Sequence, residues 1–448
     1  KITMNMAPAN IRKEGSSFDL AIALGILAST GNISKSAVEK SMFIGELSLD
    51  GEIKAVKGVL PMAICANQNG IRYLFLPEAN AREASVVKGL HIIPVKDLKE
   101  TAAIINGESE AKCFEAVEEE NQPDYSDDVD FADVKGQENV KRALEVAASG
   151  GHNCLMLGSP GCGKTMLARR LPTILPSMTF EEALEVTKIH SIAGILPRGV
   201  SLVNTRPFRC PHHTISDTGL VGGGSIPRPG EISLAHYGVL FLDEFPEFSK
   251  KALESLRQPL EDGVITISRV NASLTYPART TLICAANPCR CGHFLDKPGK
   301  CTCTPRQIQQ YLSKLSGPLL DRVDICVEVT PVKYQQLESD QPVETSAVIR
   351  ERVERTRKIQ LDRYKGMHIY SNSQLQPAMF SKFCRLDKKC RSILRDVFDR
   401  LGMSARAHSR ILKVARTIAD MDMSEEIRPV HLTEAIQYRS LDRRAWNM

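Results

Sequence analysis

The eight residues from Gly158 to Thr165 constrain this chain more than any other segment. Their sequence, Gly-Ser-Pro-Gly-Cys-Gly-Lys-Thr, fits the pattern G-x-x-x-x-G-K-[ST]. The segment follows an apolar stretch, Asn153–Leu157, that predicts a strand, and it opens into a helix-like stretch, Met166–Arg170. A strand, a glycine-rich loop and a helix in this order close backbone N–H groups around phosphate oxygens. We therefore predict a phosphate-binding loop on a parallel α/β sheet.

Each residue type in this loop has a chemical reason. Gly158, Gly161 and Gly163 let the backbone amides approach the β- and γ-phosphates, and Lys164 supplies a positive charge. The Thr165 hydroxyl is placed to ligate Mg²⁺. The predicted ligands are therefore ATP and Mg²⁺.

Two later strands are predicted to end in polar side chains. The apolar run Gly238–Leu242 ends at Asp243 and Glu244, and the run Thr280–Ala286 ends at Asn287. Because ligands of open parallel sheets bind at the carboxyl ends of strands, we expect one shared site. There Asp243 would hold Mg²⁺, Glu244 would polarise the attacking water as a general base, and Asn287 would orient that water.

Arg322 stands between two acids, Asp321 and Asp324, before the apolar run Ile325–Val329. A local ion pair with either acid is the purely structural interpretation. The functional interpretation is an arginine finger that reaches the γ-phosphate of a neighbouring subunit. In that case the active site lies between subunits and a ring is implied.

Together these blocks resemble the AAA+ ATPases, and two further segments resemble their magnesium-chelatase and replicative-helicase branch. Arg206–His213 with Gly219–Gly224 resembles the helix-2 insert of that branch. Gly263–Arg279 alternates apolar and polar residues and predicts a β-hairpin before the Asn287 strand. In related ring helicases such hairpins point into the central pore, and plain surface hairpins are the alternative. The resemblance places four more residues at the nucleotide: Val134, Gln137, Cys162 and Met166.

The N-terminal stretches Asn5–Ser29, Phe43–Ala66 and Ile71–Pro94 resemble a Lon-protease-like domain, and the whole chain resembles the ComM/YifB family of magnesium-chelatase-like ATPases. The Lon nucleophile position reads Ser17, but the position of its activating lysine reads Leu60. A serine hydroxyl without an adjacent base is a poor nucleophile, and neither Lys54 nor Lys57 falls at the matching position. We therefore expect a scaffold, an assembly surface or a DNA-contacting surface rather than a peptidase.

The expected organisation has four parts. A Lon-protease-like α+β domain covers residues 1–107, and it is expected to be N-terminally truncated because Lys1 opens inside a strand of that domain. An acidic linker is expected over 108–130, because the sequence from Glu108 to Glu138 contains 12 acidic residues and only two lysines. The AAA+ core, with its insert and hairpin, covers 131–335, and a helical lid covers 336–448.

The lid is predicted from apolar positions at helical spacing in Val348–Tyr364 and Ser404–Met421, with a shorter repeat in Val430–Arg439. The resemblance places Arg406 at the sensor-2 position, where it would contact the γ-phosphate, and Arg410 is the second choice for this role. The alternative is that Arg406 is an ordinary surface arginine in a salt bridge. Residues 344–448 hold 22 Lys and Arg against 13 Asp and Glu. This excess suits contact with DNA, although a solvated basic face is the alternative.

Four cysteines, Cys289, Cys291, Cys301 and Cys303, form two C-x-C pairs around a short loop. Four thiolates favour a structural, tetrahedral Zn²⁺, with His293 as a substitute ligand and free thiols as the alternative. The cluster Cys210–His213 is a weaker metal candidate because it lacks a second cysteine pair.

Three classes of function compete. The favoured one is a homohexameric ATPase that moves on branched or single-stranded DNA, with helicase action or branch migration in recombination and natural transformation implied by the resemblance. The second is a chelatase motor subunit for metal insertion into a tetrapyrrole, and the third is an ATP-dependent protein remodeller or protease. The odd number of cysteines, 13, indicates reduced thiols and a cytoplasmic protein, and no apolar run approaches the ~20 residues of a membrane span.

Overall fold

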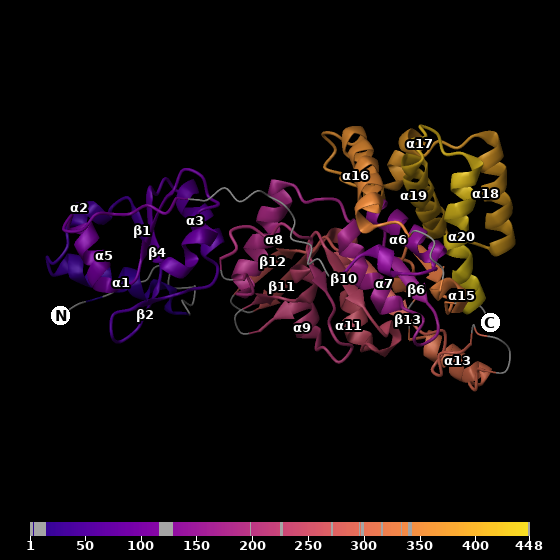
Figure 1. The fold of residues 1–448 in the computed structure, drawn as a ribbon, viewed down its shortest axis with the longest axis horizontal. Helices are drawn as coiled ribbons and strands as arrows, with labels where there is room; N and C mark the ends of the chain where they lie inside the picture. The colour runs from indigo at the N-terminus through magenta and orange to yellow at the C-terminus, as the bar shows by residue number, and fades with distance from the viewer. Residues whose placement is uncertain are drawn as a thin grey trace.

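A computed structural model describes residue 3 and the ranges 15–115, 129–197, 199–224, 227–269, 272–294, 296, 300–314, 317–332, 334–338 and 343–446. Figure 1 shows an N-terminal part at one end, an α/β core in the middle and a group of C-terminal helices beside the core. Much of the predicted acidic linker, 116–128, and the start of the first Lon-like stretch, 5–14, lie outside the described residues. Among the described helices, none has the length and apolar character needed to cross a membrane.

The N-terminal part is built on a three-stranded parallel sheet of order β1-β4-β5. Successive residues of its central strand point to opposite faces, so Leu74 and Leu76 join one apolar core and Phe75 joins another. Helices therefore cover both faces. The elements are α1 (Asp19–Ser29), α2 (Lys35–Val38), β1 (Ser41–Phe43), β2 (Glu46–Leu47), β3 (Ile53–Lys54), α3 (Val59–Gln68), β4 (Tyr73–Pro77), α4 (Ala81–Ala84), β5 (His91–Val95) and α5 (Leu98–Ile105).

The N-terminal part contacts the core directly, because α3 packs against α8 (Phe180–Ala193). The carboxylate of Glu83 is buried at this contact. It accepts hydrogen bonds from the backbone N–H of Leu60, at 3.0 Å, and from the hydroxyl of Ser191. The N–H of Gly58 also donates to the carbonyl of Ser191 at 3.1 Å. Two regions far apart in sequence are therefore joined by a buried polar network.

Replacing Glu83 with alanine is expected to lower the free energy of unfolding by about 2 kcal/mol, because buried donors on both sides of the contact would lose their acceptor. Thermal unfolding followed by circular dichroism would measure the effect. Glu78→Ala is the matched control, since the carboxylate of Glu78 is exposed and lies 3.8 Å from the ammonium of Lys96. Equal melting temperatures for the two variants would contradict the assigned role of Glu83.

The core is a five-stranded sheet of order β14-β6-β13-β10-β7, in which every neighbouring pair is parallel. Its central strands β6 and β10 are apolar at every position because helices cover both faces of the sheet. Met156 and Phe241 join the core on the side of α6 and α7, whereas Leu155 and Leu240 join the opposite core. The elements are α6 (Glu138–Gly150), β6 (Cys154–Leu157), α7 (Lys164–Arg170), β7 (Phe208–Arg209), β10 (Val239–Leu242), α11 (Lys250–Ser255), α12 (Arg257–Asp262), β13 (Thr281–Ala286), α13 (Pro305–Leu312), α14 (Gly317–Leu320), β14 (Ile325–Glu328) and α15 (Tyr334–Leu337).

The predicted helix-2 insert needs one correction. Phe208 and Arg209 form β7, the edge strand beside β10, so Arg206–His213 begins in the core sheet rather than in an insert. The pairing covers two residues, which is too short for a periodic pattern to reveal. An excursion follows it, with the two-stranded ribbon β8–β9 lying between two short helices. Its elements are α9 (Asp217–Val221), β8 (Gly222–Gly223), β9 (Arg228–Pro229) and α10 (Glu231–Leu234).

The hairpin predicted for Gly263–Arg279 is confirmed as an antiparallel pair, β11 (Val264–Arg269) with β12 (Ala272–Pro277). One face buries Ile265 and Ile267, and the other carries hydroxyl side chains. Val270 and Asn271, between the two strands, lie outside the described residues.

The C-terminal helices form one bundle whose apolar side joins the same core as α6 and α7. The predicted helices Val348–Tyr364 and Ser404–Met421 correspond to α16 and α19, and Val430–Arg439 lies within α20. The helix α18 was not predicted. The elements are α16 (Ser346–Arg363), α17 (Phe380–Phe383), α18 (Lys388–Leu401), α19 (Ala405–Met421) and α20 (Pro429–Trp446).

Candidate nucleotide site

The phosphate loop leaves β6 at Gly158 and enters α7 at Lys164. Gly161 and Gly163 have φ angles of +76° and +92°, in the left-handed region that favours glycine. A Cβ on Gly158 would lie 2.3 Å from the carbonyl oxygen of Val329, so the chain after β14 can pack this closely only against glycine. The loop therefore keeps a tight, amide-lined turn at the carboxyl edge of the sheet.

The Lys164 ammonium lies inside this turn. It donates to the carbonyl oxygens of Gly158, at 2.6 Å, and Ser159, at 3.0 Å, and to Oδ1 of Asn287 at 3.1 Å. The predicted water-orienting amide and the predicted phosphate-binding cation are thus in direct contact, although they come from different strand ends.

The Thr165 hydroxyl donates to Oδ2 of Asp243 at 2.6 Å. A hydroxyl and a carboxylate from facing elements form the hard-oxygen pair that Mg²⁺ prefers. These two residues therefore fit a Mg²⁺ ion bound beside the phosphate loop.

Glu244 follows Asp243 in an uncommon backbone conformation, with a φ of +50°, and its N–H donates to Oδ1 of Asp243 at 2.9 Å. Its Oε2 lies 3.1 Å from Nδ1 of His213. Sequence reasoning missed His213 as a partner of this carboxylate. The signal that could have revealed it is the short strand β7, which brings the segment after it to the same edge of the sheet as Asp243.

The other residues expected at the nucleotide lie around the same edge. The side-chain amide of Gln137 donates to the carbonyl oxygen of Thr330, just beyond β14. Val134, three residues before Gln137, is fully buried. Cys162 is buried in the phosphate loop with its Sγ 3.7 Å from the Lys164 ammonium, whereas Met166 is exposed on α7.

Arg322 lies at the opposite edge of the sheet. Its segment precedes β14, which runs parallel to β6, and the side-chain amide of Asn153, just before β6, donates to the Arg322 carbonyl at 2.9 Å. A four-residue strand spans roughly 13 Å, so Arg322 is separated by that length from the phosphate loop of its own chain. Its guanidinium pairs with the carboxylate of Glu261, a partner that the local sequence did not indicate.

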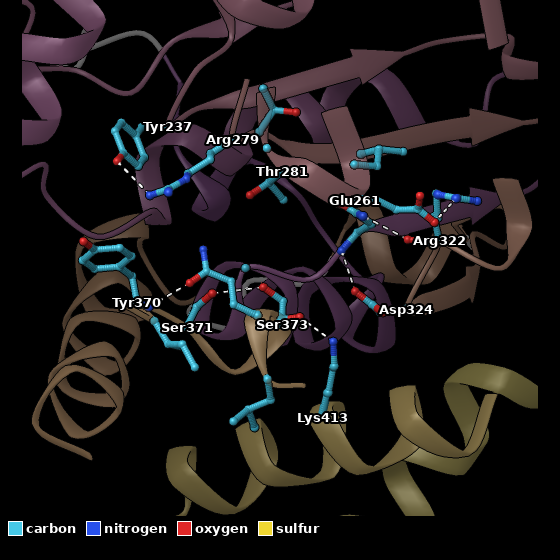
Figure 2. Close-up of a pocket in the computed structure, with 18 of the residues that line it drawn as sticks. Tyr237, Glu261, Arg279, Thr281, Arg322, Asp324, Tyr370, Ser371, Ser373 and Lys413 are labelled. Carbon is cyan, nitrogen blue, oxygen red and sulfur yellow. Dashed lines mark hydrogen bonds and ion pairs between the residues drawn. The ribbon is translucent and has the colours of Figure 1, made fainter. Parts of the chain in front are cut away.

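Arg322 borders a cavity of about 880 Å³ between the amino ends of the strands and the C-terminal helices. Figure 2 shows the Arg322–Glu261 pair on the sheet side, and Lys413 beside Ser373 on the helical side. The lining is rich in cationic side chains. These are Arg206, Arg279, Arg322, Arg357, Arg406, Arg410 and Lys413.

Arg406 lies beside Arg322 and not beside the phosphate loop of its own chain. Its guanidinium donates to Oδ2 of Asp321 at 2.9 Å, and the side chain is 64% exposed. Arg410 donates to the carbonyl of Val323 at 2.6 Å. Both arginines therefore stand at the Arg322 edge, and the contact of Arg406 with a γ-phosphate stays a prediction. The position of a lid on a sheet depends on tertiary packing, which the local motif does not encode.

Asp324 anchors this edge. Burial alone would raise the pKa of its carboxyl, but the hydrogen bond and charge of His152, 3.5 Å away, together with Arg410, lower it to about 2. The carboxylate therefore stays ionised at neutral pH and holds the start of β14, where it also accepts from the Asn153 N–H at 3.2 Å.

Two clusters of cysteine and histidine residues were predicted as candidate metal sites. The four cysteines form the one group of potential metal ligands that converges within the described ranges. His293 is not among them, because its Nδ1 lies 2.8 Å from Oδ2 of Asp296. In the weaker candidate for a metal site, Cys210–His213, Nδ1 of His212 lies 2.8 Å from the hydroxyl oxygen of Thr214.

The Lon-like position Leu60 is fully buried, and both nearby lysines have other surroundings. The Lys54 ammonium pairs with Glu52, and the Lys57 side chain lies against Gly194 at the end of α8. Neither of these contacts involves Ser17.

Comparison with protein families places the chain among magnesium-chelatase proteins. Residues 130–337 match the family model of magnesium chelatase subunit ChlI, and residues 343–439 match the model of its C-terminal region. Residues 1–80 match a further model, described as subunit ChlI of Mg-chelatase.

Relatives cover nearly the whole chain. The competence protein ComM of Haemophilus influenzae is 43% identical over 448 residues, which is 99% of this chain and 86% of that protein. The protein YifB of Escherichia coli is 41% identical over 447 residues, 99% of this chain and 86% of that protein. A protein of Mycobacterium tuberculosis is 39% identical over 422 residues, 94% of this chain and 83% of that protein.

Proposed function

Because this chain belongs to the ComM/YifB family of magnesium-chelatase-like AAA+ proteins, we propose that it is an ATP-hydrolysing ring motor that acts on DNA. Membership of the family implies ATPase activity with ATP and Mg²⁺. A homohexamer, with helicase action or branch migration on DNA during natural transformation, is the finer part of the proposal.

The proposal of a ring rests on one observation: the two halves of the site lie on opposite edges of one sheet. Lys164, Thr165, Asp243 and Asn287 meet at the carboxyl edge, while Arg322 lies at the amino edge. Since one chain does not bring both halves together, we propose that a head-to-tail neighbour supplies Arg322, and that repeated head-to-tail contacts close into a ring. Arg406 is proposed to act from the same edge on the same neighbouring nucleotide.

Within each site the chain's own residues have separate tasks. Lys164 and the loop amides bind and orient the phosphates, and Asn287 positions the attacking water. Glu244 takes a proton from that water as a general base. Mg²⁺, held by Thr165 and Asp243, would neutralise charge on the phosphate oxygens.

Contact with DNA is supported by the charge on the C-terminal helices, and a role in transformation by the relative ComM, which is named a competence protein. Basic side chains are concentrated and exposed along α17 and α18, where Asp387, Asp396 and Asp399 are the exposed acids. The basic residues are Lys382, Arg385, Lys388, Lys389, Arg391, Arg395 and Arg400. Such a face suits phosphate backbones of any sequence.

We expect four-way junction DNA to stimulate ATP turnover by the full chain, and we expect the stimulation to fall as salt rises. In the triple variant Lys388→Ala, Lys389→Ala and Arg391→Ala, the slope of log affinity against log salt should become shallower by about 0.9 for each DNA phosphate that the variant no longer neutralises. Fluorescence anisotropy of labelled junction DNA measures that slope.

The matched control neutralises three exposed lysines of the N-terminal part, Lys88, Lys96 and Lys99, and should keep the slope of the unaltered protein. Absence of stimulation by any DNA at low salt would remove the DNA part of the proposal and favour the chelatase-type motor. Peptidase activity is not proposed, since Leu60 replaces the activating lysine.

A further inference from the structure

A cluster of four cysteines lies beside the phosphate loop, where Cys289, Cys291, Cys301 and Cys303 bring their sulfur atoms within 4.8 Å of one another. The Sγ of Cys289 lies 3.3 Å from that of Cys291 and 3.8 Å from that of Cys301, and the last two are 3.6 Å apart. A disulfide would bring two sulfurs to about 2.05 Å. Sulfurs that share one tetrahedral Zn²⁺, at about 2.3 Å from the metal, stand roughly 3.8 Å apart.

The surroundings of the cluster are those of a closed site. Cys289 is fully buried and the other three cysteines are half-buried. They pack against Ile308, Tyr311 and Leu312 of α13. A tetrahedral site with four protein ligands leaves no open position for a reacting molecule, so its role is structural.

Two described residues between the cysteine pairs, Gly292 and Asp296, lie against the phosphate loop. Gly292 has a φ of +85°, and a Cβ at this position would lie 2.4 Å from Cδ of Pro160. Asp296 accepts a hydrogen bond at 2.6 Å from the hydroxyl of Ser159. Two residues of the cysteine segment therefore contact two adjacent residues of the phosphate loop.

We propose that the four cysteines bind one Zn²⁺, and that the bound metal holds Gly292 and Asp296 against Pro160 and Ser159, so that the phosphate loop keeps its nucleotide-binding shape. Loss of the metal would release this support. Nucleotide affinity would then depend on the metal and on the oxidation state of the thiols. The second half of the proposal rests on the nucleotide site proposed above, whereas the metal site does not.

Metal content tests the first half. Elemental analysis of the purified full chain should find one zinc per chain, and the double variant Cys301→Ser with Cys303→Ser should lose it. The control Cys65→Ser with Cys113→Ser alters exposed thiols elsewhere and should keep it. Iron in place of zinc, or four cluster thiols that all react with Ellman's reagent in the folded protein, would overturn the site.

Affinity for a fluorescent ATP analogue tests the second half. Asp296→Ala should keep the zinc but weaken binding about tenfold, since it removes one hydrogen bond between a charged group and the loop. Because the cysteine variants can fail to fold, the unaltered protein is also stripped of zinc with a mercurial and a chelator and then reloaded. Binding that weakens on stripping and returns on reloading supports the proposal; binding unchanged by both treatments overturns the coupling while leaving ATP binding itself established.

Discussion

Glu244→Gln is expected to slow ATP turnover by about 10² to 10⁴-fold while nucleotide affinity stays unchanged, because glutamine keeps the shape of the side chain but cannot accept the proton of the attacking water. The contacts that bind phosphate and metal come from other residues, Lys164, Thr165 and Asp243. Phosphate release at saturating ATP and equilibrium binding of a fluorescent analogue would measure the two quantities separately.

Glu247→Gln is the control for this change. Glu247 lies three residues further on, and its Oε2 pairs with the ammonium of Lys314 at 3.1 Å on the surface. Its loss should leave turnover nearly unaltered. If Glu244→Gln turned over ATP as fast as this control, another group would have to be the base.

Arg322→Ala is expected to reduce turnover by about 10³ to 10⁵-fold, the range found where an arginine finger stabilises charge on the transferred phosphate. Because Arg322 lies at the amino edge, its loss should damage the site of the next subunit. Arg428→Ala, which removes an exposed arginine paired with Asp422 at 3.7 Å, is the control and should keep activity.

Mixing the two inactive proteins separates action between subunits from action within one chain. A Glu244→Gln subunit still offers Arg322, and an Arg322→Ala subunit still offers Glu244. Mixed rings should therefore regain part of the turnover that either protein lacks alone. Mixtures that form but stay as inactive as their components would contradict the proposed interface.

The sequence predicted those features that a short local pattern encodes. The phosphate loop, the Asp243–Glu244 pair and Asn287 each follow a largely apolar strand, so their meeting at one edge follows from the parallel sheet. The first strand of the hairpin, β11, alternates buried and exposed residues, and the hairpin was also predicted. The family, indicated by the order of these motifs, is confirmed by the comparisons.

Other features depend on contacts between distant segments and gave no local signal. Strand β7 pairs over two residues only, so the segment before His213 resembled an insert, and the His213 contact with Glu244 was missed. The motif of Arg406 likewise gave no sign that packing of α19 brings its guanidinium to Asp321, at the edge of the sheet where Arg322 lies. The buried Glu83 likewise depends on two regions more than a hundred residues apart.

The contact of Glu83 and Gly58 with Ser191 joins the N-terminal part to the nucleotide-binding core. The helix α8 that carries Ser191 comes after α7 and a short turn, so it stands one step along the chain from the phosphate loop. A flexible tether would absorb any movement of α7 during the nucleotide cycle. The buried hydrogen bonds to Leu60 and Ser191 instead fix the N-terminal part to α8, so we expect the two to move together in the nucleotide cycle.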